Sequence, residues 1–136
     1  VDALIDLKEG FPVFSPTRVG FDVTTFEDVA DGDALYFRAS DGKAGKAFAN
    51  GTLDEATVVG FADTAASSGD TVKCLVAGVL DYPSTIDPGD VYFLGTTAGE
   101  INTTAPSSAG QYVVRVGEGA TTSNFSIQIE PPILLS

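Results

Sequence analysis

Residues 31–42 read DGDALYFRASDG, in which a run of four apolar residues lies between two Asp-Gly pairs. Asp-Gly is a strong short-range signal for a tight hairpin turn, and the apolar run contains strand-forming residues. The segment therefore predicts a β-strand over residues 34–39. After a turn at Asp41-Gly42, the chain is expected to return as a second strand over residues 43–49.

The same pattern recurs 57 positions further along the chain, where Gly32 falls on Gly89. The matching segments are Gly32-Asp33 with Gly89-Asp90, residues 34–37 with residues 91–94, Gly42 with Gly99, and Val59-Gly60 with Val116-Gly117. A true repeat predicts two similar β-units in one compact antiparallel β-barrel or sandwich. A chance coincidence in a chain rich in glycine and valine is the alternative.

Strand signals recur about every ten residues in the rest of the chain. The further predicted strands cover residues 57–62, 70–76, 91–94, 100–104, 111–116 and 124–129. Alternation is clearest in residues 70–76 and 124–129, where every second residue is apolar. Helical periodicity is nearly absent, and only residues 24–31 favour one helical turn, with Thr25 and Asp28 as a loose capping box. The fold class predicted is all-β.

Length and charge limit the classes of partner. The chain has 136 residues, which suits a single domain. Seven Lys and Arg residues oppose nineteen Asp and Glu residues, so the formal net charge is −12. Nucleic-acid binding requires clustered basic residues, and anionic membranes attract basic surfaces. We therefore expect neither nucleic acid nor a membrane as a partner, and no stretch approaches the ~18 apolar residues of a membrane span.

The residue types needed for most catalytic sites are missing. Histidine is absent, which excludes His-based triads, acid–base pairs and zinc sites. Cys74 is the single cysteine, so an intrachain disulfide is excluded, and we expect a buried thiol. Acidic pairs such as Asp31/Asp33 and Asp87/Asp90 lie in Gly and Pro turns, where Asp stabilises the turn; a metal contact is the other interpretation. We expect no catalytic residue, no cofactor and no metal site.

The two ends of the chain differ from the middle. Residues 1–16 contain several large apolar side chains but no turn that would fold the segment back, which predicts an extended N-terminal arm before a single β-domain over residues 17–136. At the other end, Pro131-Pro132 precedes Ile133, Leu134 and Leu135. Two consecutive prolines cannot lie inside a ladder, and an exposed aliphatic tail favours aggregation. The tail is therefore expected to dock, either onto its own domain or onto another chain.

The last third of the chain carries four spaced motifs in a characteristic order. They are PGDVYFL at residues 88–94, GEINTTAP at residues 99–106, AGQYVVRVG at residues 109–117 and PPILL at residues 131–135. This order resembles the C-terminal pattern of a family of tailed-phage virion proteins, whose members are capsid decoration (cement) proteins, head-fibre proteins or tail-fibre domains. The resemblance extends over residues 33–135 and is strongest from Pro88 onward.

The resemblance implies a non-enzymatic β-domain, often trimeric, on the exterior of an icosahedral virion capsid. Its expected partners are the major capsid protein, which it would bridge, and its own copies in a homotrimer. The arm would supply the capsid contacts Leu4, Ile5, Leu7, Phe11 and Phe14. The tail would supply the self-association contacts Ile133, Leu134 and Leu135.

Two other functions compete with decoration of the capsid. One is a head-fibre, tail-fibre or spike domain that contacts the host surface, for which the tyrosines Tyr36, Tyr82, Tyr92 and Tyr112 could line a sugar site. The sequence contains no coiled-coil or collagen-like stalk, which favours decoration. The other is a small hydrolase or sugar-modifying enzyme that uses Asp33 and Asp90.

Overall fold

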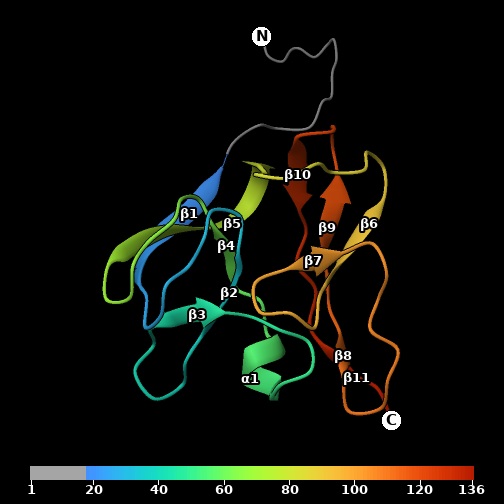
Figure 1. The fold of residues 1–136 in the computed structure, drawn as a ribbon, viewed down its shortest axis with the longest axis horizontal. Coiled ribbons are helices and arrows are strands. Elements are labelled where there is room, and N and C mark those ends of the chain that lie inside the picture. Colours follow the sequence, from blue (N-terminus) through green and yellow to red (C-terminus); the bar gives the residue numbers. More distant parts are fainter. Residues whose placement is uncertain (1–17) are drawn as a thin grey trace, which may run out of the picture.

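A computed structural model describes residues 18–136. Nine of its strands form one large antiparallel sheet that curls into a half-barrel, and two more form a small separate ladder (Figure 1). The strands are β1 (Val19–Thr24), β2 (Ala34–Phe37), β3 (Ala44–Lys46), β4 (Gly60–Ala62), β5 (Thr71–Asp81), β6 (Val91–Leu94), β7 (Ile101–Asn102), β8 (Tyr112–Val113), β9 (Arg115–Gly119), β10 (Asn124–Ile127) and β11 (Ile133–Leu134). The predicted all-β class is confirmed.

The large sheet consists of two units with the same internal order. Its strands follow the order β3-β2-β4-β5-β10-β9-β6-β7, with β1 also paired to β5. The first half of this order is mirrored by the second, so that β2 corresponds to β6, β3 to β7, β4 to β9 and the start of β5 to β10. The equivalent opposite residues are Ala34–Phe61 and Val91–Glu118, Leu35–Gly60 and Tyr92–Gly117, and Phe37–Ala44 and Leu94–Ile101.

Main-chain hydrogen bonds repeat at the same spacing as the register. The N–H of Gly32 donates to the carbonyl of Ala62 at 2.9 Å, and the N–H of Gly89 donates to the carbonyl of Gly119 at 2.8 Å. The bonds from Ala62 to Asp33 and from Gly119 to Asp90 form a second matched pair. Register and hydrogen bonds together confirm the two similar β-units predicted from the repeat in the sequence.

Strand β5 belongs to both units. Its residues from Thr71 to Ala77 pair with β1, and its residues from Gly78 to Asp81 pair with β10. Gly78 has a φ of +102°, a backbone conformation that L side chains rarely adopt. It lies where the partner strand changes, so the chain passes from the first unit to the second within one strand and without a connecting loop.

The apolar side chains form two cores. A small core lies inside the first unit and contains Val23, Val29, Leu35, Ala44, Ala62, Val72 and Cys74. A larger core joins the two units, and its centre is a group of aromatic rings. Phe61 of β4 meets Phe125 of β10 edge-on at 5.3 Å between ring centroids, and Phe125 meets Tyr92 at 5.6 Å. Such pairs add about 0.5–1.5 kcal/mol each beyond the burial of their area.

The helical turn predicted at residues 24–31 is wrong. The main chain of this segment pairs with residues 66–70 instead, because Thr25 donates its N–H to the Asp70 carbonyl and Val29 exchanges hydrogen bonds with Ala66. The short helix α1 (Leu53–Ala56) lies elsewhere. It begins at Thr52, which forms a true capping box with Glu55. No helix within residues 18–136 is long and apolar enough to cross a membrane.

Several strands differ from the sequence prediction. Strand β5 continues to Asp81 although the prediction ended at residue 76, and β3, β4 and β7 are shorter than the predicted ranges 43–49, 57–62 and 100–104. The strand expected over residues 111–116 is divided into β8 and β9, and Val114 between them is fully buried. Strands β1 and β11 were not predicted. Strand β11 begins directly after Pro131-Pro132 and pairs with β8, so the prolines delimit a short ladder and do not interrupt one. This places the tail on its own domain.

Two glycines at equivalent positions of the units allow neighbouring strands to approach closely. A Cβ atom on Gly60 would lie 2.5 Å from the Leu75 carbonyl oxygen, and one on Gly117 would lie 2.0 Å from the Ser126 carbonyl oxygen. Replacing either glycine by alanine should therefore lower the free energy of unfolding by about 2–3 kcal/mol, as measured by denaturant titration.

The matched control is Gly42→Ala. Nothing lies within 4 Å of a Cβ at that position, although its φ is +73°. The cost there should be only the conformational one, about 1 kcal/mol. Equal losses at Gly42 and at the two strand glycines would contradict the close-approach explanation.

Candidate interaction surfaces

Of the acidic residues assigned to turns, Asp33 stabilises its turn through its carboxylate, while Asp28, expected in a capping box, instead links two segments that are far apart in the chain. An Asp33 carboxylate oxygen accepts the N–H of Ala30 at 2.8 Å, and an Asp28 carboxylate oxygen accepts the N–H of Ser68 at 2.8 Å. Burial is the main cause that raises the pKa of Asp33 above its ordinary value. Among residues 18–136, no three His, Cys, Asp or Glu side chains come close enough to hold a metal ion.

Arg18 lies among carboxylates at the start of β1. Its Nη2 atom is 3.2 Å from Asp81 Oδ2, and its Nη1 atom is 3.8 Å from Asp63 Oδ1. The pKa of Asp31 is raised by burial and then by the nearby charges of Asp63 and Asp81. No sequence signal could have revealed this group, because its members are far apart in the chain and meet only through the pairing of β1 with β5.

Cys74 is completely buried in the small core of the first unit, as predicted. Its thiol shares a face of β5 with Val72, while Lys73 on the opposite face is exposed. Burial raises the pKa of this thiol from 9.0 to about 11. A thiol that is both inaccessible and protonated at neutral pH is a poor nucleophile.

The tyrosines in the large sheet are packing residues. Tyr36 and Tyr92 are buried in the core that joins the units, and the Tyr92 hydroxyl accepts the N–H of Asp87 at 2.8 Å. Tyr82 packs against the same core, and burial raises its pKa to about 12. Tyr112 on β8 is half-buried. These four side chains therefore do not form an aromatic sugar-binding surface.

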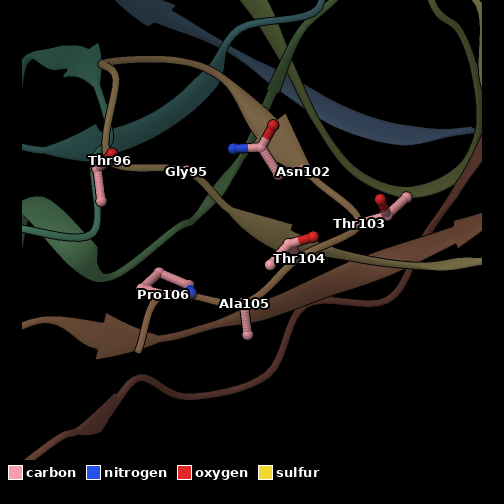
Figure 2. A pocket seen from close by; sticks show the side chains of 7 residues that line it. All are labelled: Gly95, Thr96, Asn102, Thr103, Thr104, Ala105 and Pro106. Carbon is pink, nitrogen blue, oxygen red and sulfur yellow. The ribbon is translucent and has the colours of Figure 1, made fainter. Parts of the chain in front are cut away.

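One pocket of about 310 Å³ lies where the chain turns back after β7. Figure 2 shows that its lining residues come from the start of the β6–β7 turn, from the end of β7 and from the segment after it; they are Gly95, Thr96, Asn102, Thr103, Thr104, Ala105 and Pro106. The polar groups are hydroxyls and one amide, and none of the lining side chains is ionisable. The pocket can therefore donate and accept hydrogen bonds but has no acid or base for proton transfer.

Large apolar side chains remain exposed in two places. On β1, Val19 is 51% exposed and Phe21 is 43% exposed; we call these the β1 patch. On α1 and β11, the residues Leu53, Ile133 and Leu134 are at least half exposed; we call these the C-terminal patch. Helix α1 and β11 lie towards the same end of the molecule, whereas β1 starts at the opposite end (Figure 1).

The residues predicted from the sequence to make contacts fall into two groups. Leu4, Ile5, Leu7, Phe11 and Phe14 lie outside the described residues. The tail is described, and its strand β11 pairs with β8 through Ile133–Val113 and Leu134–Tyr112. The main chain of the tail is thus docked, while two of the three predicted self-association side chains, Ile133 and Leu134, remain exposed.

Comparison with known proteins gives no relative from which a function could be transferred. No protein-family model matches the chain, and a search of curated proteins finds no significant match.

The buried thiol makes a prediction about stability at high pH. The unfolded chain releases the Cys74 proton at its ordinary pKa of 9.0, whereas the folded chain holds it until about 11. The free energy of unfolding should therefore fall as the pH rises through this range, because ionisation of the thiol stabilises the unfolded state at a lower pH than the folded state.

Denaturant titrations across this pH range would measure the effect. In Cys74→Ala, the decrease in the free energy of unfolding that begins near pH 9 should disappear. The decrease at higher pH that comes from the raised pKa of Tyr82 should remain. An identical pH profile in the variant would contradict the assignment.

Proposed function

We propose that this chain is a non-enzymatic structural protein of a tailed-phage virion, namely a decoration protein that binds the exterior of the capsid and bridges major capsid proteins. The observation that carries the proposal is the placement of the exposed apolar side chains. They lie on the two terminal strands and on α1, and so form adhesive surfaces at opposite ends of a compact β-body.

The location of the sequence motifs supports the same function. The motifs that resemble the phage family form the turn before β6, strands β6 to β9, and the docked strand β11. They therefore build most of the second unit together with the tail that covers one end of it. The first strand of the molecule and the arm before it lie outside the resemblance, which suits a segment that is specific for one capsid.

The acidic charge suits a protein that is repeated over a capsid surface. A formal net charge of −12 keeps neighbouring copies soluble and repels nucleic acid. Repetition around a symmetry axis also adds avidity, so a small footprint on each capsid protein is sufficient for stable attachment.

Virions of the phage that encodes this chain provide the direct test. Antibodies against the β-body should label the outside of the head by immunogold electron microscopy, and the chain should be found in purified particles by mass spectrometry. Particles without the chain, or label confined to the tail, would overturn the proposal of capsid decoration.

Removal of residues 1–16 should separate folding from attachment. The variant should melt at the temperature of the full chain, because the described core is formed by later residues. It should no longer co-sediment with heads that lack the protein. Undiminished occupancy of the heads would contradict the proposed role of Leu4, Ile5, Leu7, Phe11 and Phe14.

Charges on the C-terminal patch should weaken self-association in the proposed homotrimer. Ile133 and Leu134 are 64% and 58% exposed, so the double variant Ile133→Asp, Leu134→Asp should leave the melting temperature nearly unchanged. Sedimentation equilibrium should show a lower mean mass than for the unaltered chain. The matched control is the double variant Ile133→Thr, Leu134→Ser, which reduces the apolar area without adding charge. An unchanged mass in the charged variant would contradict the role of the tail.

A fibre or spike domain that contacts the host surface is the second candidate. The pocket beside β7 favours it, because uncharged hydroxyl and amide groups are suited to hydrogen bonds with sugar hydroxyls (Figure 2). Binding to host surface polysaccharide that is lost in Asn102→Ala, together with label on fibres, would favour this function over decoration.

A further inference from the structure

Strand β1 has one hydrogen-bonding edge that pairs with no other strand of the described chain over its first four residues, Val19 to Asp22. Thr25, directly after β1, exchanges main-chain hydrogen bonds with Asp70 and Gly69 on the side of β5. Main-chain groups alternate along an antiparallel strand, so those of Val23 and Phe21 also face β5, while those of Gly20, Asp22 and Thr24 point away. At the end of this edge, Thr25 forms a parallel bridge with Ala44, whose carbonyl accepts the N–H of Phe26 at 3.0 Å. Within residues 18–136, Gly20 and Asp22 pair with no strand on that side of β1.

Unpaired edges of this kind are normally short, covered or protected by charge. Strand β1 has six residues, and the four from Val19 to Asp22 are all exposed. On one face it carries the β1 patch, in which Phe21 contacts Phe37 edge-on at 6.0 Å. On the other face it carries Asp22, which lies 3.6 Å from Lys73. The edge is therefore suited to accept another strand.

We propose that β1 pairs antiparallel with β1 of a second copy of this chain, with the two Gly20 residues opposite each other across a two-fold axis. In this register, Val19 of each copy lies opposite Phe21 of the other. These two positions form the closely spaced, non-hydrogen-bonded pairs, in which side chains are nearest to each other. The β1 patch of each copy thus covers that of its partner.

The same register is complementary in charge. Arg18 of each copy, which also pairs with Asp81 of its own chain at 3.2 Å, lies opposite Asp22 of the other, on the face of the strand away from the β1 patch. If the two-fold axis passed through Asp22 and not through Gly20, the two Asp22 carboxylates would lie opposite each other, which is unfavourable. Glycine at the axis presents no side chain to its counterpart, so the two main chains can approach without obstruction.

The contact does not depend on the proposed function. Strand β1 starts at the end of the molecule opposite β11, so a two-fold contact there leaves the C-terminal patch free for other copies (Figure 1). Failure of the β1 contact would leave the proposal of capsid decoration intact, and failure of virion labelling would leave the β1 contact intact.

A charge exchange tests the contact in the full chain. Sedimentation equilibrium at physiological ionic strength should show dimerisation, and Asp22→Lys or Arg18→Glu should weaken it by about tenfold or more, since each change opposes two pairs of like charges. The double variant Arg18→Glu, Asp22→Lys restores opposite charges across the contact and should restore association. Since Arg18→Glu also removes the ion pairs with Asp63 and Asp81 of its own chain, the double variant is compared with Arg18→Glu alone, with folding of both checked by circular dichroism. Asp87→Lys is the matched control, because it makes the same change of charge at an exposed turn outside β1.

Cysteine pairing tests the register. A mixture of Val19→Cys and Phe21→Cys proteins should form a disulfide-linked dimer under mild oxidation, while either protein alone should not. The native Cys74 is buried and should not interfere. Three results would overturn the proposal: association unaffected by the charge changes, cross-linking of Phe21→Cys with itself, and a full chain that stays monomeric until residues 1–17 are removed. The last result would mean that the chain's own N-terminal segment occupies the edge.

Discussion

Strand β5 supplies main-chain hydrogen bonds to three other strands, and the rest of the sheet is built outward from it. Strands β1 and β4 pair with Leu75 and Cys74 from opposite sides, and β10 pairs with the last four residues of β5, from Gly78 to Asp81. The eleven residues of β5 therefore contribute side chains to both cores, since Cys74 packs in the small core and Leu80 packs in the large one. Strand β5 is the one strand of the large sheet that pairs with strands of both units, and the large core adds side-chain contacts between them.

The two units share their strand order and several paired positions, but different side chains fill their interiors. Leu35 and Ala44 line the small core of the first unit, whereas the equivalent positions in the second unit are Tyr92 and Ile101 in the large core. The larger side chains of the second unit reach the outer face of the first, where Phe61 packs on Phe125. These larger side chains join the two units in one core. Each unit alone would leave part of this aromatic cluster in water, so the two units stabilise each other.

Much of the fold could be predicted from local patterns. The Asp-Gly turns, the alternation in residues 70–76 and 124–129, and the shift of 57 positions predicted most strands and the two units. The helical turn at residues 24–31 failed because main-chain pairing with residues 66–70 outweighs a weak local preference.

Of the candidate surfaces, the tail was predicted and the β1 patch was not. The three aliphatic residues after Pro131-Pro132 form a distinct local pattern, from which docking of the tail could be predicted. Val19 and Phe21 follow no motif in the sequence, and they form a candidate surface because, over Val19 to Asp22, β1 pairs with β5 on one side and with no strand of the described chain on the other. Likewise, Arg18, Asp63 and Asp81 meet through pairing over long distances in the chain, for which single-sequence patterns carry no signal.

The arrangement of β1 along β5 has a mechanical consequence. A pull applied at Arg18 along the strand axis loads the whole β1–β5 ladder in shear, so its hydrogen bonds share the tension and do not open one after another. Because β10 pairs with the last residues of the same strand β5, force entering at the first strand passes along a single continuous strand into the second unit. A body of this construction resists extension along that axis better than peeling across it.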